Sequence, residues 1–218
     1  FIDSLPLKVS YFFANFIANF AYTIDFKHRK RIIRHLLHAG IAKNVHEAKQ
    51  IAKLNFKHFA KVAVEIVKFS KIISKDNIHD FIKFTGDKDS IKHILNKQSK
   101  KMGQSIIITA HFGNWEIAGP SFTILTERPM LTIMREFDNP KIGKFIEERR
   151  RCYDHHIQYK QGAIKALLDS ARKGHSICML ADQHASSSEG VETIFFGHPA
   201  RSHVSPASLH LKTGIPII

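Results

Sequence analysis

Short apolar runs alternate with stretches of helical length from about residue 105 to the end of the chain. The apolar runs predict strands at Ile106–Thr109, Met130–Met134, Ile157–Tyr159 and Ser176–Ala181. The segments between them predict helices after Asn114, from Asn139–Pro140, over Gly162–Lys173 and over Ser205–Thr213, and Gly214–Ile218 predicts the start of a further strand. Because strands and helices alternate, we expect an α/β domain with a mixed central sheet and helices on its faces.

The chain ahead of residue 105 has mostly helical periodicity. Three helices are predicted, over Pro6–Ile24, over Asp25–Ala39 with Gly40 as its stop, and from Asn44, where Glu47 completes a start that resembles a capping box. A short strand at Phe81–Phe84 and a helix from Asp87 or Asp89 to about Lys100 are predicted next. The pattern therefore divides the chain into a helical segment, residues 1–74, and an α/β segment, residues 75–218.

The first predicted helix is apolar and uncharged from Val9 to Ile24, and a basic stretch follows it directly. A helix over Pro6–Ile24 is about 28 Å long, which is marginal for a bilayer crossing of about 20 apolar residues. Three interpretations stay open: a short membrane anchor, an interfacial helix that lies on the membrane, and a buried core helix. Asn15 and Asn19 share one side of the helix, which favours a packed or interfacial helix over a free span.

Charge is strongly positive and unevenly distributed. The formal net charge is +14; residues 1–104 hold 20 Lys and Arg against 8 Asp and Glu, and residues 105–218 hold 13 against 11. Nucleic acid, an anionic membrane surface and an acidic carrier protein all fit such an excess, and charge alone does not choose among them. The two cysteines, Cys152 and Cys178, lack the spacing of a metal site, and we expect none.

Candidate catalytic residues lie where the strand Ile106–Thr109 gives way to a helix. His111 follows the strand, and Asn114 can cap a helix whose first turn holds Glu116. Ligands of α/β folds bind at the carboxyl ends of the strands. A histidine whose tautomer is fixed by a carboxylate can take a proton from a hydroxyl, so we predict a catalytic pair of His111 and Glu116. The spacing alone also fits a polar loop after a core strand.

The string HFGNWE, residues 111–116, resembles the active-site motif of the bacterial lipid A biosynthesis acyltransferases. That family belongs to a wider group of glycerolipid acyltransferases with a His-x4-Asp/Glu motif. Further segments resemble the family in the same order: MREFDNP (134–140), MLADQ (179–183), FFGHPARS (195–202) and TGIPII (213–218). The likeness covers about residues 75–218 and implies a catalytic domain that is incomplete at its C-terminus. His198 departs from the Arg or Lys that is typical of the family.

The resemblance also implies residues that bind substrate. Arg135 follows a predicted strand and precedes Asn139, as in the family, and the planar guanidinium of Arg suits phosphate because it makes paired hydrogen bonds. We therefore predict that Arg135 and Asn139 bind substrate, and that Asp182 and Gln183 shape the donor or acceptor pocket. Plainer alternatives remain, since Arg135 can pair with a neighbouring acid on the surface and Asp182 and Gln183 can cap the next turn.

By this resemblance the protein is expected to be an O-acyltransferase. The donor is expected to be a fatty acyl thioester of acyl carrier protein or coenzyme A, and the acceptor a hydroxyl of a phosphorylated glycolipid such as a lipid A precursor. We expect no metal or redox cofactor and no nucleic acid partner. Residues 1–74 are expected to meet an anionic surface at the cytoplasmic side of the inner membrane. The alternatives are the same chemistry on a lysophospholipid or a mannosylated phosphoinositide, and a non-catalytic basic protein that binds membrane or nucleic acid.

Overall fold

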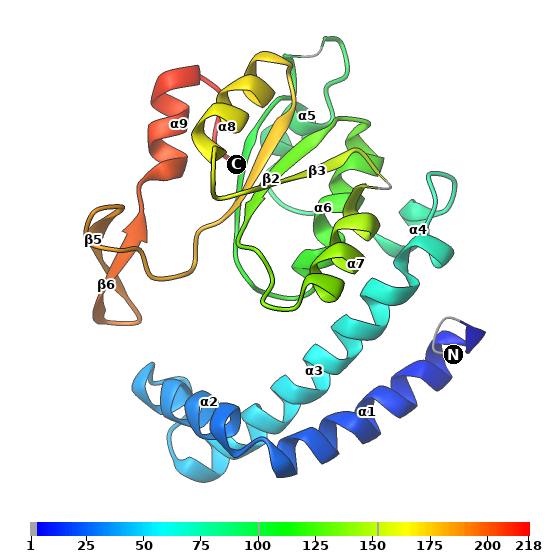
Figure 1. Cartoon of the computed structure of the whole chain (residues 1–218), viewed down its shortest axis with the longest axis vertical. Coiled ribbons are helices and arrows are strands. Elements are labelled where there is room, and N and C mark those ends of the chain that lie inside the picture. The colour runs from blue at the N-terminus through cyan, green and yellow to red at the C-terminus, as the bar shows by residue number, and fades with distance from the viewer. Residues whose placement is uncertain (1–3, 100, 152) are drawn as a thin grey trace. The chain divides into compact units, whose positions relative to one another are not determined.

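The computed structural model describes residues 4–99, 101–151 and 153–218. Lys100, where a predicted helix was to end, and Cys152 lie outside the described residues. The chain forms two compact units, the first made of residues 1–68 and 192–200 and the second of residues 69–191 and 201–218 (Figure 1). The predicted boundary after residue 74 falls within the second unit. Each unit is described by itself below.

Helices make up most of the first unit. They are α1 (Leu7–Ile24), α2 (Phe26–His38) and most of α3 (Val45–Ile72), which confirms the three predicted helices. Asp25 caps α2 by accepting a hydrogen bond from the backbone N–H of His28 at 3.1 Å. Asn44 caps α3 in the same way through the N–H of Glu47 at 2.9 Å, and the Glu47 carboxylate accepts from the N–H of Lys43 at 2.8 Å.

Helix α1 packs through a narrow stripe of small residues. Ser10, Ala14 and Ala18 are buried, and the hydroxyl of Tyr11 donates to the Glu65 carboxylate of α3 at 2.7 Å. The opposite face leaves large apolar side chains exposed: Val9, Phe12, Phe13, Phe16, Ile17, Phe20 and Ile24. Of the three interpretations left open for this helix, the structure does not support a helix buried in the core, because only the small residues are covered. Of the helices that the structure describes, none has the length and hydropathy needed to cross a bilayer.

A parallel sheet forms the centre of the second unit. Its strands are β1 (Ile106–Thr109), β2 (Met130–Met134), β3 (His155–Tyr159) and β4 (Ser176–Leu180), in the order β1-β4-β2-β3. Every pairing among these described strands is parallel, so the mixed sheet that we expected is wrong. The reason is that a helix carries the chain back to the same end of the sheet before each new strand begins. Residues 214–218, which were predicted to start a strand, form an isolated parallel bridge to β1 instead, and the N–H of Ile106 donates to the carbonyl of Pro216 at 2.8 Å.

Side chains of alternate strand residues form two apolar layers, one on each face of the sheet. On one face Ile106, Leu131 and Ile177 pack with residues of α8 (Ala163–Arg172) and α9 (Ser205–Thr213). On the other face Met130 and Cys178 pack with residues of α5 (Lys88–Ile94) and α6 (Trp115–Thr126). The helices therefore cover both faces, as predicted, and leave the carboxyl edge of the sheet to the loops (Figure 1).

Local predictions were wrong at three places. Phe81–Phe84 is not a strand: Phe81 ends the short helix α4 (Ile78–Phe81), and Ile82 and Phe84 after it are partly buried against helices. Helix α5 ends at Ile94 rather than near residue 100. The sequence pattern also did not predict the β-hairpin of β5 (Gly190–Phe195) and β6 (His198–His203), whose second strand is largely polar.

Candidate active site

The register of β1 against β4 brings two candidate residues together. Thr109 of β1 pairs with Leu180 of β4, and His111 and Asp182 each lie two residues beyond that pair. The Nδ1 atom of His111 is 2.8 Å from Oδ1 of Asp182, and the backbone N–H of His111 donates to Oδ2 at 2.8 Å. Asp182 therefore holds both the ring and the backbone of His111.

The hydrogen bonds of this pair determine the ionisation of Asp182 and the tautomer of His111. Burial acts to raise the pKa of Asp182, but the hydrogen bonds and the charge of His111 outweigh it and hold that pKa below its usual range. An ionised Asp182 accepts the proton of Nδ1, so the lone pair of His111 is on Nε2. Nε2 makes no hydrogen bond to any described residue, and the His111 side chain is 36% exposed. The pair therefore has the hydrogen bonding of a general base whose free nitrogen is Nε2.

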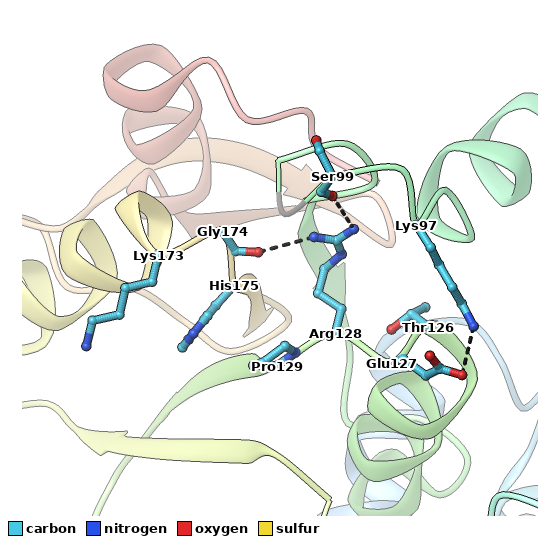
Figure 2. A pocket seen from close by; sticks show the side chains of 9 residues that line it. All are labelled: Lys97, Ser99, Thr126, Glu127, Arg128, Pro129, Lys173, Gly174 and His175. Carbon is cyan, nitrogen blue, oxygen red and sulfur yellow. Dashed lines mark hydrogen bonds and ion pairs between the residues drawn. The ribbon is translucent and has the colours of Figure 1, made fainter.

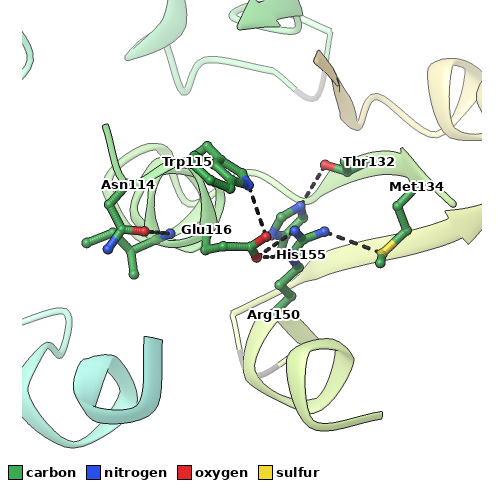
Figure 3. Close-up of polar contacts among 8 residues, drawn as sticks. Asn114, Trp115, Glu116, Thr132, Met134, Arg150 and His155 are labelled. Atoms are coloured by element: carbon green, nitrogen blue, oxygen red, sulfur yellow. Dashed lines mark hydrogen bonds and ion pairs between the residues drawn. The ribbon is translucent and has the colours of Figure 1, made fainter. Parts of the chain in front are cut away.

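Glu116 lies in the first turn of α6, as predicted, where Asn114 caps the helix through the N–H of Ile117 at 3.3 Å. Its carboxylate does not bond to His111. Oε2 of Glu116 instead accepts from Nη2 and Nε of Arg150 at 2.6 and 3.0 Å, and Oε1 accepts from the indole N–H of Trp115 at 3.0 Å (Figure 3). The structure therefore pairs the two predicted catalytic residues with different partners.

Arg150 is a functional candidate that the sequence analysis missed. It belongs to α7 (Pro140–Arg151), where it shares the buried stripe with Gly143 and Ile146. The side chains of Arg150 and Glu116 are only 9% and 12% exposed, so their ion pair joins α7 to α6 in a largely dry setting. The sequence did carry a signal for this residue, because Arg150 falls on the apolar stripe of an amphipathic helix. A charge at such a position needs a buried partner of opposite sign.

His155 of β3 lies against α6 and close enough to Arg150 for that charge to act on it. Its Nε2 lies 2.7 Å from the Thr132 hydroxyl, and a methyl group added at Gly119 of α6 would lie 2.4 Å from the ring (Figure 3). Burial, reinforced by the charge of Arg150, lowers the pKa of His155 to about 3. The ring is therefore a neutral spacer that sets how closely α6 approaches the sheet.

A family model described as bacterial lipid A biosynthesis acyltransferase matches residues 1–218. The chain belongs to this family. Two curated relatives are phosphatidylinositol mannoside acyltransferases of Mycobacterium tuberculosis, from strain CDC 1551 / Oshkosh and strain ATCC 25618 / H37Rv. Each is 26% identical over 119 residues, which are 52% of this chain and 37% of the relative. The chain thus spans well under half the length of the curated relatives it matches.

The other three residues predicted to bind substrate make no hydrogen bond to His111 in the described part of the chain. Arg135 follows β2, and β4 lies between β2 and β1, so the two strands are not neighbours. Arg135 is largely exposed and pairs with Asp138 at 2.8 Å. Asn139 directly precedes α7 and its side chain accepts from the N–H of Lys141 at 3.0 Å, while Gln183 is exposed and follows Asp182 in the chain. Of the four predicted binding residues, the structure joins only Asp182 to His111.

A pocket of about 320 Å³ lies at the other end of the sheet, ahead of the first residues of β2 and β4. Arg128 crosses it to the carbonyl oxygens of Gly174 and Ser99, and Lys97 pairs with Glu127 at 3.0 Å (Figure 2). Since His111 is at the carboxyl end, this pocket is not part of the candidate active site. Within residues 4–99, 101–151 and 153–218, no three His, Cys, Asp or Glu side chains come together as metal ligands.

Proposed function

We propose that the protein is an O-acyltransferase that moves a fatty acyl chain from an acyl thioester to a hydroxyl of a phosphorylated glycolipid. The observation that carries this proposal is the Asp182–His111 pair at the carboxyl edge of a parallel sheet, in which Nδ1 of a partly exposed His111 is bonded to Asp182 and Nε2 is left for a substrate. Membership of the lipid A biosynthesis acyltransferase family supports the same reaction class.

In the proposed reaction His111 is the general base. Nε2 takes the proton of the acceptor hydroxyl while the hydroxyl oxygen attacks the thioester carbonyl carbon. The C–S bond then breaks, the ester forms, and the imidazolium returns the proton to the leaving thiolate. Asp182 stabilises the imidazolium between these steps and keeps Nδ1 protonated. A histidine–aspartate pair thus takes the place of the histidine–glutamate pair expected from the motif.

Glu116 has a different proposed role. Its two oxygens are already occupied by Trp115 and Arg150, so it acts on the reaction by fixing the helix that follows the His111 loop. The ring of Trp115 also meets the ring of His111 edge to face, with centroids 5.3 Å apart. The buried ion pair of Glu116 and Arg150 therefore positions Trp115, the side chain that packs against His111.

We propose acyl carrier protein or coenzyme A as the carrier of the acyl donor, and a lipid A precursor as the acceptor. The basic charge of residues 1–104 suits an acidic carrier, and Arg135 is exposed enough to bind a phosphate in place of Asp138. A second acceptor is favoured by a specific observation, since the matched relatives are phosphatidylinositol mannoside acyltransferases. A mannosylated phosphoinositide, or a lysophospholipid, would need no change in the chemistry at His111.

We further propose that the first unit associates with the cytoplasmic side of the inner membrane. The exposed apolar face of α1 and the basic helix α2 together have the composition of an interfacial segment on anionic lipid. Such an association would bring the enzyme to its lipid acceptor.

The test is acyl transfer in detergent with acyl carrier protein and coenzyme A thioesters, offered a lipid A precursor, a lysophospholipid and a phosphatidylinositol mannoside in competition. Transfer to the lipid A precursor that is lost in His111→Ala supports the proposal. Transfer only to another acceptor keeps the mechanism and changes the substrate. Transfer that survives in His111→Ala would contradict the mechanism.

A further inference from the structure

The tip of the β5–β6 hairpin exposes three consecutive large apolar side chains. Ile194, Phe195 and Phe196 are 72%, 59% and 53% exposed. The rings of Phe195 and Phe196 contact each other edge to face, with centroids 4.6 Å apart. The hairpin tip (Ile194–Phe196) therefore forms an apolar cluster that the described part of the chain leaves open to solvent.

Phe196 occupies a backbone conformation that a bulky side chain rarely adopts. The two residues of the hairpin turn, Phe196 and Gly197, have φ angles of +50° and +76°. Positive φ at both positions is typical of a type I′ turn, which favours Asn or Gly at the first position. Phe196 is thus unfavourable for the turn, and more than half of its surface is exposed, so its presence points to a role outside the folding of the hairpin.

The tip is fixed to the basic helix α2 within the first unit. The Nε2–H of His198 donates to the carbonyl of His38 at 2.9 Å, and the two rings stack with centroids 3.8 Å apart. Helix α2 has no acidic residue, and its exposed cations are Lys27, Lys30, Arg31 and Arg34. Apolar side chains therefore lie on the same compact unit as a band of uncompensated positive charge.

We propose that the hairpin tip inserts into an anionic lipid bilayer as a second membrane contact besides α1, while α2 binds the headgroups. Apolar residues that enter the acyl boundary next to cations that meet anionic headgroups are the two components of interfacial binding. An anionic bilayer supplies both an apolar interior for the tip and negative headgroups for the cations of α2. This inference rests on the membrane association in the proposed function.

The experiment places a tryptophan in the tip of the full chain, as Phe195→Trp, and mixes the protein with vesicles of phosphatidylglycerol and acyl-brominated phosphatidylcholine. The matched control is Leu211→Trp, because Leu211 is also apolar and is 83% exposed on α9 in the second unit. The native Trp115 supplies the same background in both. We expect quenching beyond that background for Phe195→Trp and none for Leu211→Trp.

Phe196→Asn gives a second readout that a merely structural role would not produce. Asparagine suits the turn, so the melting temperature should stay the same or rise, while vesicle affinity falls about tenfold or more for the loss of one buried aromatic side chain. If the protein binds vesicles but Phe195→Trp is not quenched, the hairpin inference is wrong. It is also wrong if Phe196→Asn binds vesicles with unchanged affinity. In both cases the proposed membrane association still stands. No vesicle binding by the parent overturns the hairpin inference together with the proposed membrane association, but leaves acyl transfer in detergent intact.

Discussion

Two carboxylates close to His111 have opposite surroundings. Asp182 is 28% exposed and bonds to the imidazole, whereas Glu116 is 12% exposed and bonds to a buried guanidinium. Glu116 is five residues from His111 in the chain, and Asp182 is seventy-one residues away. The difference arises because strand register, and not chain distance, sets which side chains meet at the edge of a parallel sheet. Asp182 is therefore placed to act in catalysis, and Glu116 to hold the framework.

The largest expected effect is the loss of the base. His111→Ala should lower the acyl-transfer rate by about 10²–10⁴-fold, which is the usual contribution of a general base. Steady-state transfer in detergent measures it, and an unchanged melting temperature would show that the fold is intact. A His111→Ala enzyme with parental turnover would contradict the catalytic half of the comparison.

Asp182→Asn should have the next largest effect. An asparagine can hold His111 in the wrong tautomer and cannot stabilise the imidazolium, so kcat should fall roughly a hundredfold or more with little change in stability. The matched control is Asp169→Asn, which changes a partly exposed aspartate of α8 that pairs with Arg172, and which should stay near the parental rate. Equal losses in the two variants would mean that Asp182 has no special relation to His111.

Glu116→Gln should act mainly on stability. It leaves the Arg150 cation buried without a carboxylate, at a cost of about 3 kcal/mol in the free energy of unfolding. Thermal or denaturant unfolding measures this loss. The double variant Glu116→Gln/Arg150→Met should recover most of it, because the unpaired charge is gone. If both variants melt like the parent, the ion pair does not hold the two helices.

Gly119→Ala tests how tightly α6 lies against the sheet. The added methyl group would lie 2.4 Å from Cε1 and 2.7 Å from Nδ1 of His155, so the ring or the helix must shift. We expect a loss of about 1–3 kcal/mol in the free energy of unfolding, as for other overpacked cores. Ala118→Gly, at the neighbouring position of the same helix, controls for the general effect of substitution in α6.

The smallest effect concerns pH. The pKa of Asp182 is depressed in the folded protein, so its contribution to stability is present above its ordinary pKa of about 3.9 and is lost as pH falls through the folded value. The unfolding free energy of the parent should therefore drop toward that of Asp182→Asn below about pH 4. If the difference in unfolding free energy between the two proteins stays constant to lower pH, the pKa of Asp182 does not fall in this range and the prediction is wrong.

Much of the fold was predictable because it is local. Ile106–Thr109, Met130–Met134 and Ser205–Thr213 match the observed strands and helix, since a short β-branched run or a Pro-started amphipathic segment has one favourable conformation. The Asn114 cap was predictable for the same reason. Phe81–Phe84 was not, because a short apolar segment is buried equally well by helices without strand partners.

The site was predictable only in part. His111 was found from its place after a strand, and Asp182 was included as a binding residue. Their contact depends on β4 lying between β1 and β2, which is a long-range choice that no local pattern encodes. Arg150 was hidden in a run of three arginines, and only its position on the buried stripe of α7 distinguishes it from Arg149 and Arg151.

The most direct measurement of the central claim is a kinetic double-mutant cycle between His111 and Asp182. The values of kcat/KM are compared for the parent, His111→Ala, Asp182→Asn and the double variant. If Asp182 acts through His111, the double variant should be no slower than His111→Ala alone, because residues that act as a unit are not additive. If the two losses instead multiply, Asp182 acts independently of His111 and the proposed pair is wrong.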